Sequence, residues 1–306
     1  MSDPIRSADV FRAVRAGLPT VALESTVITH GLPRPHNLTL ALDMERAVRD
    51  EGATPATVAF LDGELHIGLT NLELERLAYE KEPLKIGPRD FARAIVEESS
   101  GGTTVAGTML ACKRTDIKVF ATGGIGGVHR ESSNDISADL QALASIPMIV
   151  VCAGAKSILD LPATLEYLET TSVPVVGFGT DEFPAFYSRE SGLDVSHKLD
   201  DPLDIAEFAH AHWNAGMQSA VLVVNPVPKL DAIPKSEMEP LIEKASSEAR
   251  AQGVHGKDVT PFLLNRINEL TEGNSMRANL SLLLNNARLA AQLARAWRSS
   301  ERRKVI

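Results

Sequence analysis

Short apolar runs alternate with helical patterns along almost the whole chain, and this alternation limits the folds open to it. Apolar runs rich in β-branched residues predict strands at residues 19–24, 57–61, 64–68, 117–121, 147–152, 173–178 and 219–224. Helical spacing covers residues 37–51, 71–80, 88–98, 103–114, 136–144, 156–170, 202–215, 236–252, 260–273 and 276–298. Strands that alternate with helices favour a mainly parallel sheet covered on both faces. We therefore expect a three-layer α/β/α fold.

Two local signals refine this expectation. Asp62 and Gly63, flanked by apolar alternation, predict a β-hairpin within the otherwise parallel sheet. Ser236 and Glu239 fit a capping box at the start of a late helix. The chain has no internal repeat, low-complexity segment or long linker. We expect residues 1–306 to form a single domain with the C-terminal helices packed on the core.

Charge and cysteine content exclude some classes of protein. A net charge of -9, spread along the chain, argues against a general nucleic-acid binder but leaves room for a small anionic substrate. Cys112 and Cys152 lie in apolar contexts, which predicts buried, reduced thiols. No apolar run reaches membrane length, and the first residues lack a signal peptide. We expect a soluble cytoplasmic protein with no membrane partner.

Polar or glycine-rich turns follow five of the predicted strands. They are Glu24 with the two residues after it, and residues 122–130, 153–157, 179–183 and 225–228. In an open parallel sheet, ligands bind outside the carboxyl ends of the strands. The coincidence of five such turns predicts a functional site at this edge of the sheet.

Three side chains in these turns suggest chemistry. Lys156 stands just past a buried strand, where a partly desolvated lysine becomes a nucleophile towards carbonyl compounds; the alternative is a lysine that caps a carbonyl group or extends to solvent. Glu24 ends an apolar run, which favours a functional carboxylate over a surface one. The glycines of 122–130 indicate close backbone approach, but without a helix directly after them they are no dinucleotide fingerprint. His129, taken alone, is more often structural.

Two further segments are ambiguous. Asp135 and Asp139 lie four residues apart and would share a helical face; this suggests either a divalent-cation site or a helix start with a solvated aspartate one turn later. Residues 99–110 place glycines and threonines at a helix start, where free N–H groups favour a phosphate unless an ordinary Ser/Thr cap occupies them. Lys85, in a turn before a helix, is a phosphate partner or a surface lysine.

A late helix carries three asparagines on an otherwise apolar pattern: Asn279, Asn285 and Asn286. Asn279 and Asn286 are one heptad apart and share a face, where an asparagine needs a hydrogen-bonding partner. We expect either core hydrogen bonds to a neighbouring loop or contact with a substrate.

Eight blocks of the chain together resemble the pseudouridine-5'-phosphate glycosidase family, also called the indigoidine synthase A-like family. The blocks are ALESTVITHGLPRPHN, PATVAFLDGELHIGL, ATGGIGGVHR, DISADL, VCAGAKSILD, GFGTDEFPAFYSR, GKDVTPFLL and NLSLLLNNARLAAQLA. They run from about residue 10 to about residue 295, and blocks this long in one order are highly specific.

The resemblance implies an enzyme, classed as a hydro-lyase, that reversibly cleaves the C–C glycosidic bond of pseudouridine 5'-phosphate to uracil and ribose 5-phosphate in pseudouridine catabolism. It also implies Mn2+ as the metal cofactor and a homotrimer. By motif, Lys156 is the nucleophile that forms a Schiff base with the ring-opened sugar, Glu24 the proton donor and Asp135 the metal ligand. Substrate binding is implied for Lys85, Thr104, Val105, His129, Ser137, Ala138, Asp139 and Asn279.

Three other functions account for part of these residues. A lysine-dependent aldolase acting on another sugar phosphate keeps the lysine and the phosphate site but needs no pyrimidine. A non-catalytic sugar-phosphate sensor needs no nucleophile, so the presence of Glu24, Asp135 and Lys156 together argues against it. A nucleotide-dependent oxidoreductase lacks the strand–turn–helix context that its glycine motif requires.

Overall fold

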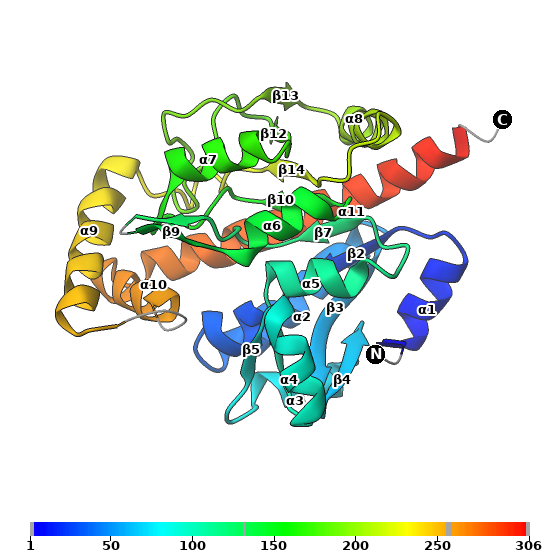
Figure 1. Ribbon diagram of the computed structural model, residues 1–306, viewed down its shortest axis with the longest axis horizontal. Coiled ribbons are helices and arrows are strands. Elements are labelled where there is room, and N and C mark those ends of the chain that lie inside the picture. The colour runs from blue at the N-terminus through cyan, green and yellow to red at the C-terminus, as the bar shows by residue number, and fades with distance from the viewer. Residues whose placement is uncertain (1–2, 131, 255–258, 304–306) are drawn as a thin grey trace.

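The computed structural model describes residues 3–130, 132–254 and 259–303, and an eleven-stranded sheet forms the centre of this part of the chain (Figure 1). Its strands are β1 (Ile5–Arg6), β2 (Thr20–Leu23), β3 (Thr54–Leu61), β4 (Glu64–Ile67), β5 (Leu84–Ile86), β6 (Gly101–Thr103), β7 (Val119–Ala121), β10 (Ile149–Cys152), β12 (Val175–Phe178), β13 (His197–Leu199) and β14 (Val221–Val224). The order is β1-β4-β3-β2-β7-β10-β14-β12-β13, with β6 also paired to β3 and β5 to β6. Only the pairs β3–β4 and β3–β6 are antiparallel among these described strands.

A second, small sheet is antiparallel and has the order β11-β8-β9. Its strands are β8 (Val128–His129), β9 (Ser132–Ile136) and β11 (Leu159–Asp160). They come from the segments that follow β7 and β10, so this sheet lies at the edge where the functional site is expected.

Helices cover both faces of the central sheet. They are α1 (Ala8–Arg15), α2 (His36–Asp50), α3 (Asn71–Ala78), α4 (Phe91–Val96), α5 (Val105–Cys112), α6 (Ala138–Ser145), α7 (Leu161–Thr170), α8 (Pro202–Asn214), α9 (Lys235–Ala251), α10 (Val259–Leu270) and α11 (Asn274–Arg303). The crossover from β2 to β3 runs one way along the sheet, whereas those from β3 through β7 and β10 to β12 run the other way. Because such crossovers are right-handed, α2 lies on one face and α5, α6 and α7 on the other. α11 packs against both α2 and α8, so helices lie on both faces of the sheet and the three-layer α/β/α arrangement is confirmed (Figure 1).

All seven predicted strands are confirmed, and so is the hairpin. β3 and β4 pair antiparallel across Asp62 and Gly63, whose φ angles are 50° and 79°. Positive φ at both turn residues is the type I′ geometry that matches the right-handed twist of the strands. The two-residue turn pairs Leu61 with Glu64 and so sets the register of the two strands.

Several helix starts differ from the predictions. The predicted helix 156–170 begins only at Leu161, because the Asp160 carboxylate caps it by accepting from the Ala163 N–H at 3.0 Å. The capping box at Ser236 and Glu239 is wrong, because α9 begins at Lys235 and Ser236 is already helical. The short helix α1 and the strands β1, β5, β6, β8, β11 and β13, of two or three residues each, were not predicted, because they are too short to carry a periodic signal.

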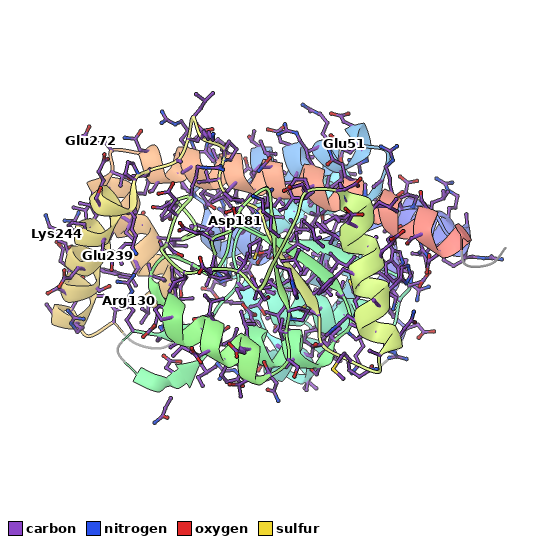
Figure 2. All side chains as sticks on the ribbon, turned by 90° about the horizontal axis from the view of Figure 1, so that it is seen from above. Glu51, Arg130, Asp181, Glu239, Lys244 and Glu272 are labelled. Atoms are coloured by element: carbon purple, nitrogen blue, oxygen red, sulfur yellow. The ribbon has the colours of Figure 1, made fainter. Side chains whose placement is uncertain are left out.

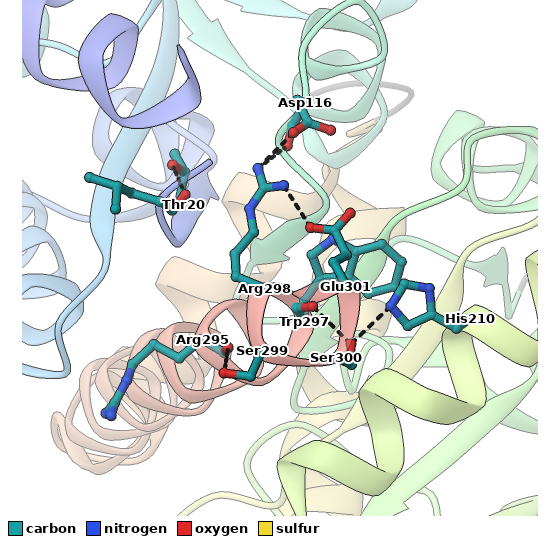
Figure 3. A network of polar contacts seen from close by, with 10 residues as sticks. Thr20, Asp116, His210, Arg295, Trp297, Arg298, Ser299, Ser300 and Glu301 are labelled. Atoms are coloured by element: carbon teal, nitrogen blue, oxygen red, sulfur yellow. Dashed lines mark hydrogen bonds and ion pairs between the residues drawn. The ribbon is translucent and has the colours of Figure 1, made fainter. Parts of the chain in front are cut away.

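The C-terminal helix packs on the core, as predicted. Its apolar side, including Leu282 and Leu283, is buried against the sheet. Near its end Arg298 donates to Asp116 at 2.7 Å and the Ser300 hydroxyl hydrogen-bonds the His210 ring at 2.9 Å, which ties α11 to the loop before β7 and to α8 (Figure 3). At the opposite end of the molecule, α9 and α10 pack on each other; Figure 2 shows α9 from above.

Cys112 and Cys152 are both buried and form no disulfide, as expected. Burial raises the pKa of each thiol to about 12, so both stay protonated at neutral pH. In the part of the chain that the structure describes, no helix combines the length and apolar character that crossing a bilayer requires. Residues 256–258 of the block GKDVTPFLL lie outside the described residues.

Candidate active site

Three of the five polar turns come together at one cavity of about 1010 Å³, which is large for a small-molecule site. Glu24 reaches it from the end of β2, the glycine-rich turn from the end of β7, and Lys156 from beyond β10. The described turns 179–183 and 225–228 are not part of its lining. They serve packing instead: in the first, for example, the Glu182 carboxylate accepts from two backbone N–H groups of the following loop.

The same cavity collects every residue for which the resemblance implies a role. Its lining includes Glu24, Lys85, Thr104, Val105, His129, Asp135, Ser137, Ala138, Asp139, Lys156 and Asn279. These residues come from β5, β8, β9, α5, α6, α11 and the turns after β2 and β10. Elements this far apart in sequence meet only because the carboxyl ends of the strands share one edge of the sheet.

Glu24 is a buried carboxyl group, with 9% of its surface exposed. Its Oε1 accepts a hydrogen bond from the hydroxyl of Thr122, the first residue after β7. Burial raises the pKa of Glu24 above its ordinary value, and the charge of Asp139 adds to the rise, while the Lys156 ammonium and the Thr122 hydroxyl oppose it. A carboxyl group whose pKa is raised in this way is better suited to act as a general acid than an ordinary glutamate.

Lys156 follows β10 in a loop that is bonded to the glycine-rich turn after β7. The Lys156 N–H donates to the Ile125 carbonyl at 3.1 Å, and the Ile125 N–H donates to the Gly154 carbonyl at 3.1 Å. The glycines of that turn leave no room for side chains: a Cβ atom on Gly124 would collide with the Phe186 ring, and one on Gly126 with the Ser137 hydroxyl. The close backbone approach expected of these glycines is therefore confirmed, and their neighbours are side chains of the surrounding loops.

Asp135 and Asp139 do not share a helical face, contrary to the reading based on their spacing. Asp135 lies on β9, and α6 begins only after Ser137, whose Oγ accepts from the Asp139 N–H at 3.2 Å. The Asp139 carboxylate is buried and accepts from the N–H groups of Ala106 at 2.9 Å and Gly126 at 2.8 Å. It therefore joins the starts of α5 and α6 to the glycine-rich turn.

Asp135 and His129 lie on the paired strands β9 and β8 and line the cavity. Asp135 Oδ2 is 4.0 Å from His129 Nδ1, and the Asp135 side chain is 59% exposed. Within residues 3–130, 132–254 and 259–303, no group of three or more His, Cys, Asp or Glu side chains is placed to hold a metal ion. An ion at Asp135 thus fits only if water and substrate oxygens supply most of its ligands, as they often do for small divalent ions.

The start of α5 is capped rather than open. The Thr104 Oγ1 accepts from the Gly107 N–H at 3.1 Å, and the Ala106 N–H is bonded to Asp139. Two of the N–H groups expected to bind phosphate are therefore occupied, as in an ordinary threonine cap. Lys85 lies on β5 and not in a turn, and its charge acts on Glu24 across the cavity.

The sequence reading missed several residues of the lining. Arg89, Arg93 and Lys113 add positive charge to the lining, which favours a phosphorylated ligand. Asp90 lies 3.8 Å from Arg89, and Glu97 pairs with Arg93 at 2.8 Å. The two arginines follow Lys85 closely in PLKIGPRDFAR, so their basic spacing was a usable signal. Thr122 is the first residue of the glycine-rich turn, and its hydrogen bond to Glu24 left no signal in the sequence.

The asparagines of α11 were expected either to make core hydrogen bonds or to contact a substrate, and Asn286 and Asn279 differ in this respect. Asn286 is fully buried; its Nδ2 donates to the Thr122 carbonyl at 2.8 Å, and its Oδ1 accepts from Asn225 Nδ2 at 3.0 Å. It makes the core hydrogen bonds to neighbouring loops that were one expectation. Asn279, one heptad earlier, lines the cavity, as the other expectation required.

Comparison with known proteins agrees with this geometry. A family profile described as "Indigoidine synthase A like protein" matches residues 9–296. The chain is 52% identical over 288 residues to the pseudouridine-5'-phosphate glycosidase of Solibacter usitatus, covering 94% of this chain and 96% of that protein. It is 53% identical over 294 residues to the pseudouridine-5'-phosphate glycosidase of Paracoccus denitrificans, covering 95% and 97%.

Two solved structures have the same fold. An indigoidine synthase A-like protein from Thermotoga maritima matches with a TM-score of 0.89 and 36% identity over 97% of this chain and 98% of that chain. The prealnumycin C-glycosynthase AlnA, in complex with ribulose 5-phosphate, matches with a TM-score of 0.91 and 38% identity over 99% and 100%. The profile and these relatives span nearly the whole chain, and we conclude that it belongs to the indigoidine synthase A-like family.

Proposed function

We propose that this protein is an enzyme that reversibly cleaves the C–C glycosidic bond of pseudouridine 5'-phosphate to give uracil and ribose 5-phosphate. The observation that carries the proposal is a buried Glu24 of raised pKa that shares a cavity with Lys156. Relatives about half identical to this chain are named for this activity. AlnA, a C-glycosynthase of the same fold, binds a pentose-derived phosphate, ribulose 5-phosphate.

The chemistry explains why a lysine is needed. Ordinary glycosidases use two carboxylates and expel an oxygen or nitrogen leaving group. Here the sugar is bonded to carbon, and breaking that bond leaves an electron pair on C5 of uracil. An imine between Lys156 and the ring-opened sugar lowers the barrier to this step, because its formation drives the electron pair out of the C–C bond.

The proposed cleavage has three steps. Glu24 gives its proton to the ribose ring oxygen as the bond from that oxygen to C1' breaks, and the neutral Lys156 amine bonds to C1'. The nitrogen lone pair then forms the imine while the bond from C1' to uracil C5 breaks, and C5 takes up the proton that the lysine nitrogen releases. Water hydrolyses the imine to ribose 5-phosphate and frees Lys156.

The remaining lining residues would hold the substrate. Lys85, with the arginines near it and the segment at Thr104 and Val105, would bind the phosphate. Further substrate contacts are proposed for His129, Ser137, Ala138, Asp139 and Asn279. Binding the remote phosphate would align C1' with Lys156, which is where binding energy is useful to the reaction.

The proposal includes Mn2+, with Asp135 as its one protein carboxylate. When bound, such an ion supplies positive charge that offsets the charge developing on the uracil carbonyl oxygens. From the resemblance we further propose a cytoplasmic homotrimer and the hydro-lyase reaction class. Size-exclusion chromatography with light scattering tests the trimer.

The first test mixes purified protein with uracil, ribose 5-phosphate and Mn2+ and searches for a C-linked nucleotide by liquid chromatography–mass spectrometry. We expect product from wild type and none from Lys156→Ala. Lys198→Ala is the matched control, because Lys198 is paired with Asp181 at 2.9 Å and lies outside the cavity lining. Product from Lys156→Ala would reject the nucleophile, and no product from folded wild type, with pseudouridine 5'-phosphate also uncleaved, would reject the function.

A second test traps the imine. Borohydride with ribose 5-phosphate should label the peptide that contains Lys156, and labelling of another lysine alone would contradict the mechanism. The lysine-dependent aldolase would be favoured if Lys156 is labelled without uracil present and the enzyme then turns over other aldehydes but forms no product with uracil. Binding of ribose 5-phosphate without labelling or turnover would favour the sensor.

A further inference from the structure

Arg130 connects three parts of the molecule through one guanidinium group. It follows β8, and its Nε and Nη2 donate to the carbonyls of Leu159 at 3.1 Å and Ser157 at 2.9 Å. Its Nη1 and Nη2 also donate to the two carboxylate oxygens of Glu239 on α9, at 2.5 Å and 3.4 Å. Figure 2 shows Arg130 and Glu239 labelled side by side at this end of the molecule. A planar fork of donors can make this set of contacts, and a lysine ammonium cannot.

The two carbonyls belong to residues that follow Lys156 directly in the chain. Ser157 and Leu159 are buried, with 5% and 3% of their surfaces exposed. The Leu159 N–H donates to the Lys156 carbonyl at 3.0 Å, so Lys156 and Leu159 form one tight turn. On its other side, Lys156 is held by the Ile125 carbonyl of the glycine-rich turn. Arg130 therefore adds to the pairing of β11 with β8 in fixing the half of the loop that the Ile125 carbonyl does not hold.

Glu239 extends this contact to the helices that border the cavity. α9 packs against α10, and α10 contributes Thr260, Pro261 and Leu264 to the cavity lining. The Arg130–Glu239 pair thus joins the helical end of the cavity to the loop of Lys156. The Arg130 side chain is 30% exposed, so the pair alone adds little stability. Its consequence is geometric.

We propose that Arg130 is a positioning residue for Lys156 and that Glu239 holds the Arg130 guanidinium group in its bonding orientation. The inference rests on the proposed function, because it takes Lys156 as the group that bonds to the sugar. A nucleophile displaced by about 1 Å can react about a hundredfold more slowly. Loss of the fork should therefore slow formation of the imine while substrate binding persists.

The test compares Arg130→Lys and Glu239→Gln with a matched control, Arg266→Lys. Arg266 is 31% exposed, similar to Arg130, and pairs with Glu248 of α9 at 2.5 Å and with Glu269 at 2.7 Å. Among the described contacts of Arg266, none is to the Lys156 loop. For each variant, rapid quenching with borohydride gives the rate of adduct formation with ribose 5-phosphate, and steady-state cleavage gives kcat and KM.

Arg130→Lys should slow adduct formation and kcat by about 10- to 100-fold, with KM within about twofold of wild type. Glu239→Gln should act in the same direction but less, and the double variant should be no slower than Arg130→Lys, because both changes act through one fork. Arg266→Lys should react like wild type. These outcomes support a positioning role.

A wild-type rate of adduct formation in Arg130→Lys, together with a lowered unfolding temperature, would overturn the proposal and leave Arg130 a structural residue. If Arg130→Lys does not fold, Glu239→Gln decides, because it keeps the arginine; a wild-type rate there overturns the proposal. If wild type itself is not labelled at Lys156, the proposed function fails first, so the two failures are distinguishable.

Discussion

Replacing Asn286 with leucine should destabilise the protein strongly, although the two side chains are similar in size. Asn286 has no exposed surface. It donates to the Thr122 carbonyl at 2.8 Å and accepts from Asn225 Nδ2 at 3.0 Å. Leucine removes both bonds and leaves a carbonyl oxygen and an amide N–H without partners in a dry environment.

The size of the effect follows from these two groups. Each unsatisfied buried group costs about 1–3 kcal/mol, or about 2–6 kcal/mol for the pair. The greater apolar burial of leucine returns about 1–2 kcal/mol. Taking the middle of each range, we expect the free energy of unfolding to fall by about 2.5 kcal/mol, which corresponds to a Tm lower by about 5–10 °C in a chain of this size. Activity should fall as well, because Thr122 also bonds Glu24.

Urea unfolding followed by circular dichroism measures this change, with Asn285→Leu as the control. Asn285, the neighbouring residue on α11, is only half-buried and makes one long bond to the Pro226 carbonyl, at 3.4 Å. Its replacement should cost less than about 1 kcal/mol. If Asn286→Leu falls within about 0.5 kcal/mol of wild type, or costs no more than the control, the reasoning from buried polar partners is refuted.

Two carboxyl groups give predictions that depend on pH. Glu24→Gln should abolish turnover yet raise the free energy of unfolding at pH 7 by about 0.5–2 kcal/mol. The reason is that the pKa of Glu24 in the folded protein lies above its ordinary value of 4.5, so its ionisation opposes folding. The gain should vanish below pH 4.5, where Glu24 is protonated in both states; denaturant titrations at several pH values check this, and a gain that persists there contradicts it. Asp139→Asn should lower the pKa of Glu24 by removing a nearby negative charge, which moves the basic limb of the kcat/KM profile to lower pH. It should also cost about 1–3 kcal/mol, because an amide cannot accept from both Ala106 and Gly126. An unmoved limb or an unchanged stability in thermal melts would count against the assigned position of Asp139.

Local sequence patterns were enough to predict the main strands of the central sheet. The runs that became β2, β7, β10 and β14 are short, apolar and bounded by turns, so burial on both faces leaves a readable signal. The hairpin turn at Asp62 and Gly63 also follows from chemistry within a few residues. The small sheet of β8, β9 and β11 left no such signal, because β8 and β11 have two residues each, β9 is mostly polar, and β11 pairs with a strand from a distant part of the chain.

By itself, the sequence determined the fold class, the edge of the sheet where chemistry gathers, and the two residues, Glu24 and Lys156, that stand out there. The environment and the hydrogen-bonding partners of the remaining polar residues became clear only from the tertiary structure. The Asp139 carboxylate accepts hydrogen bonds from two backbone N–H groups, Asn286 makes buried hydrogen bonds to neighbouring loops, and Asn279 lines the cavity. The physical reason is that burial and the identity of a hydrogen-bonding partner depend on elements far along the chain, whereas periodicity and turn chemistry are local.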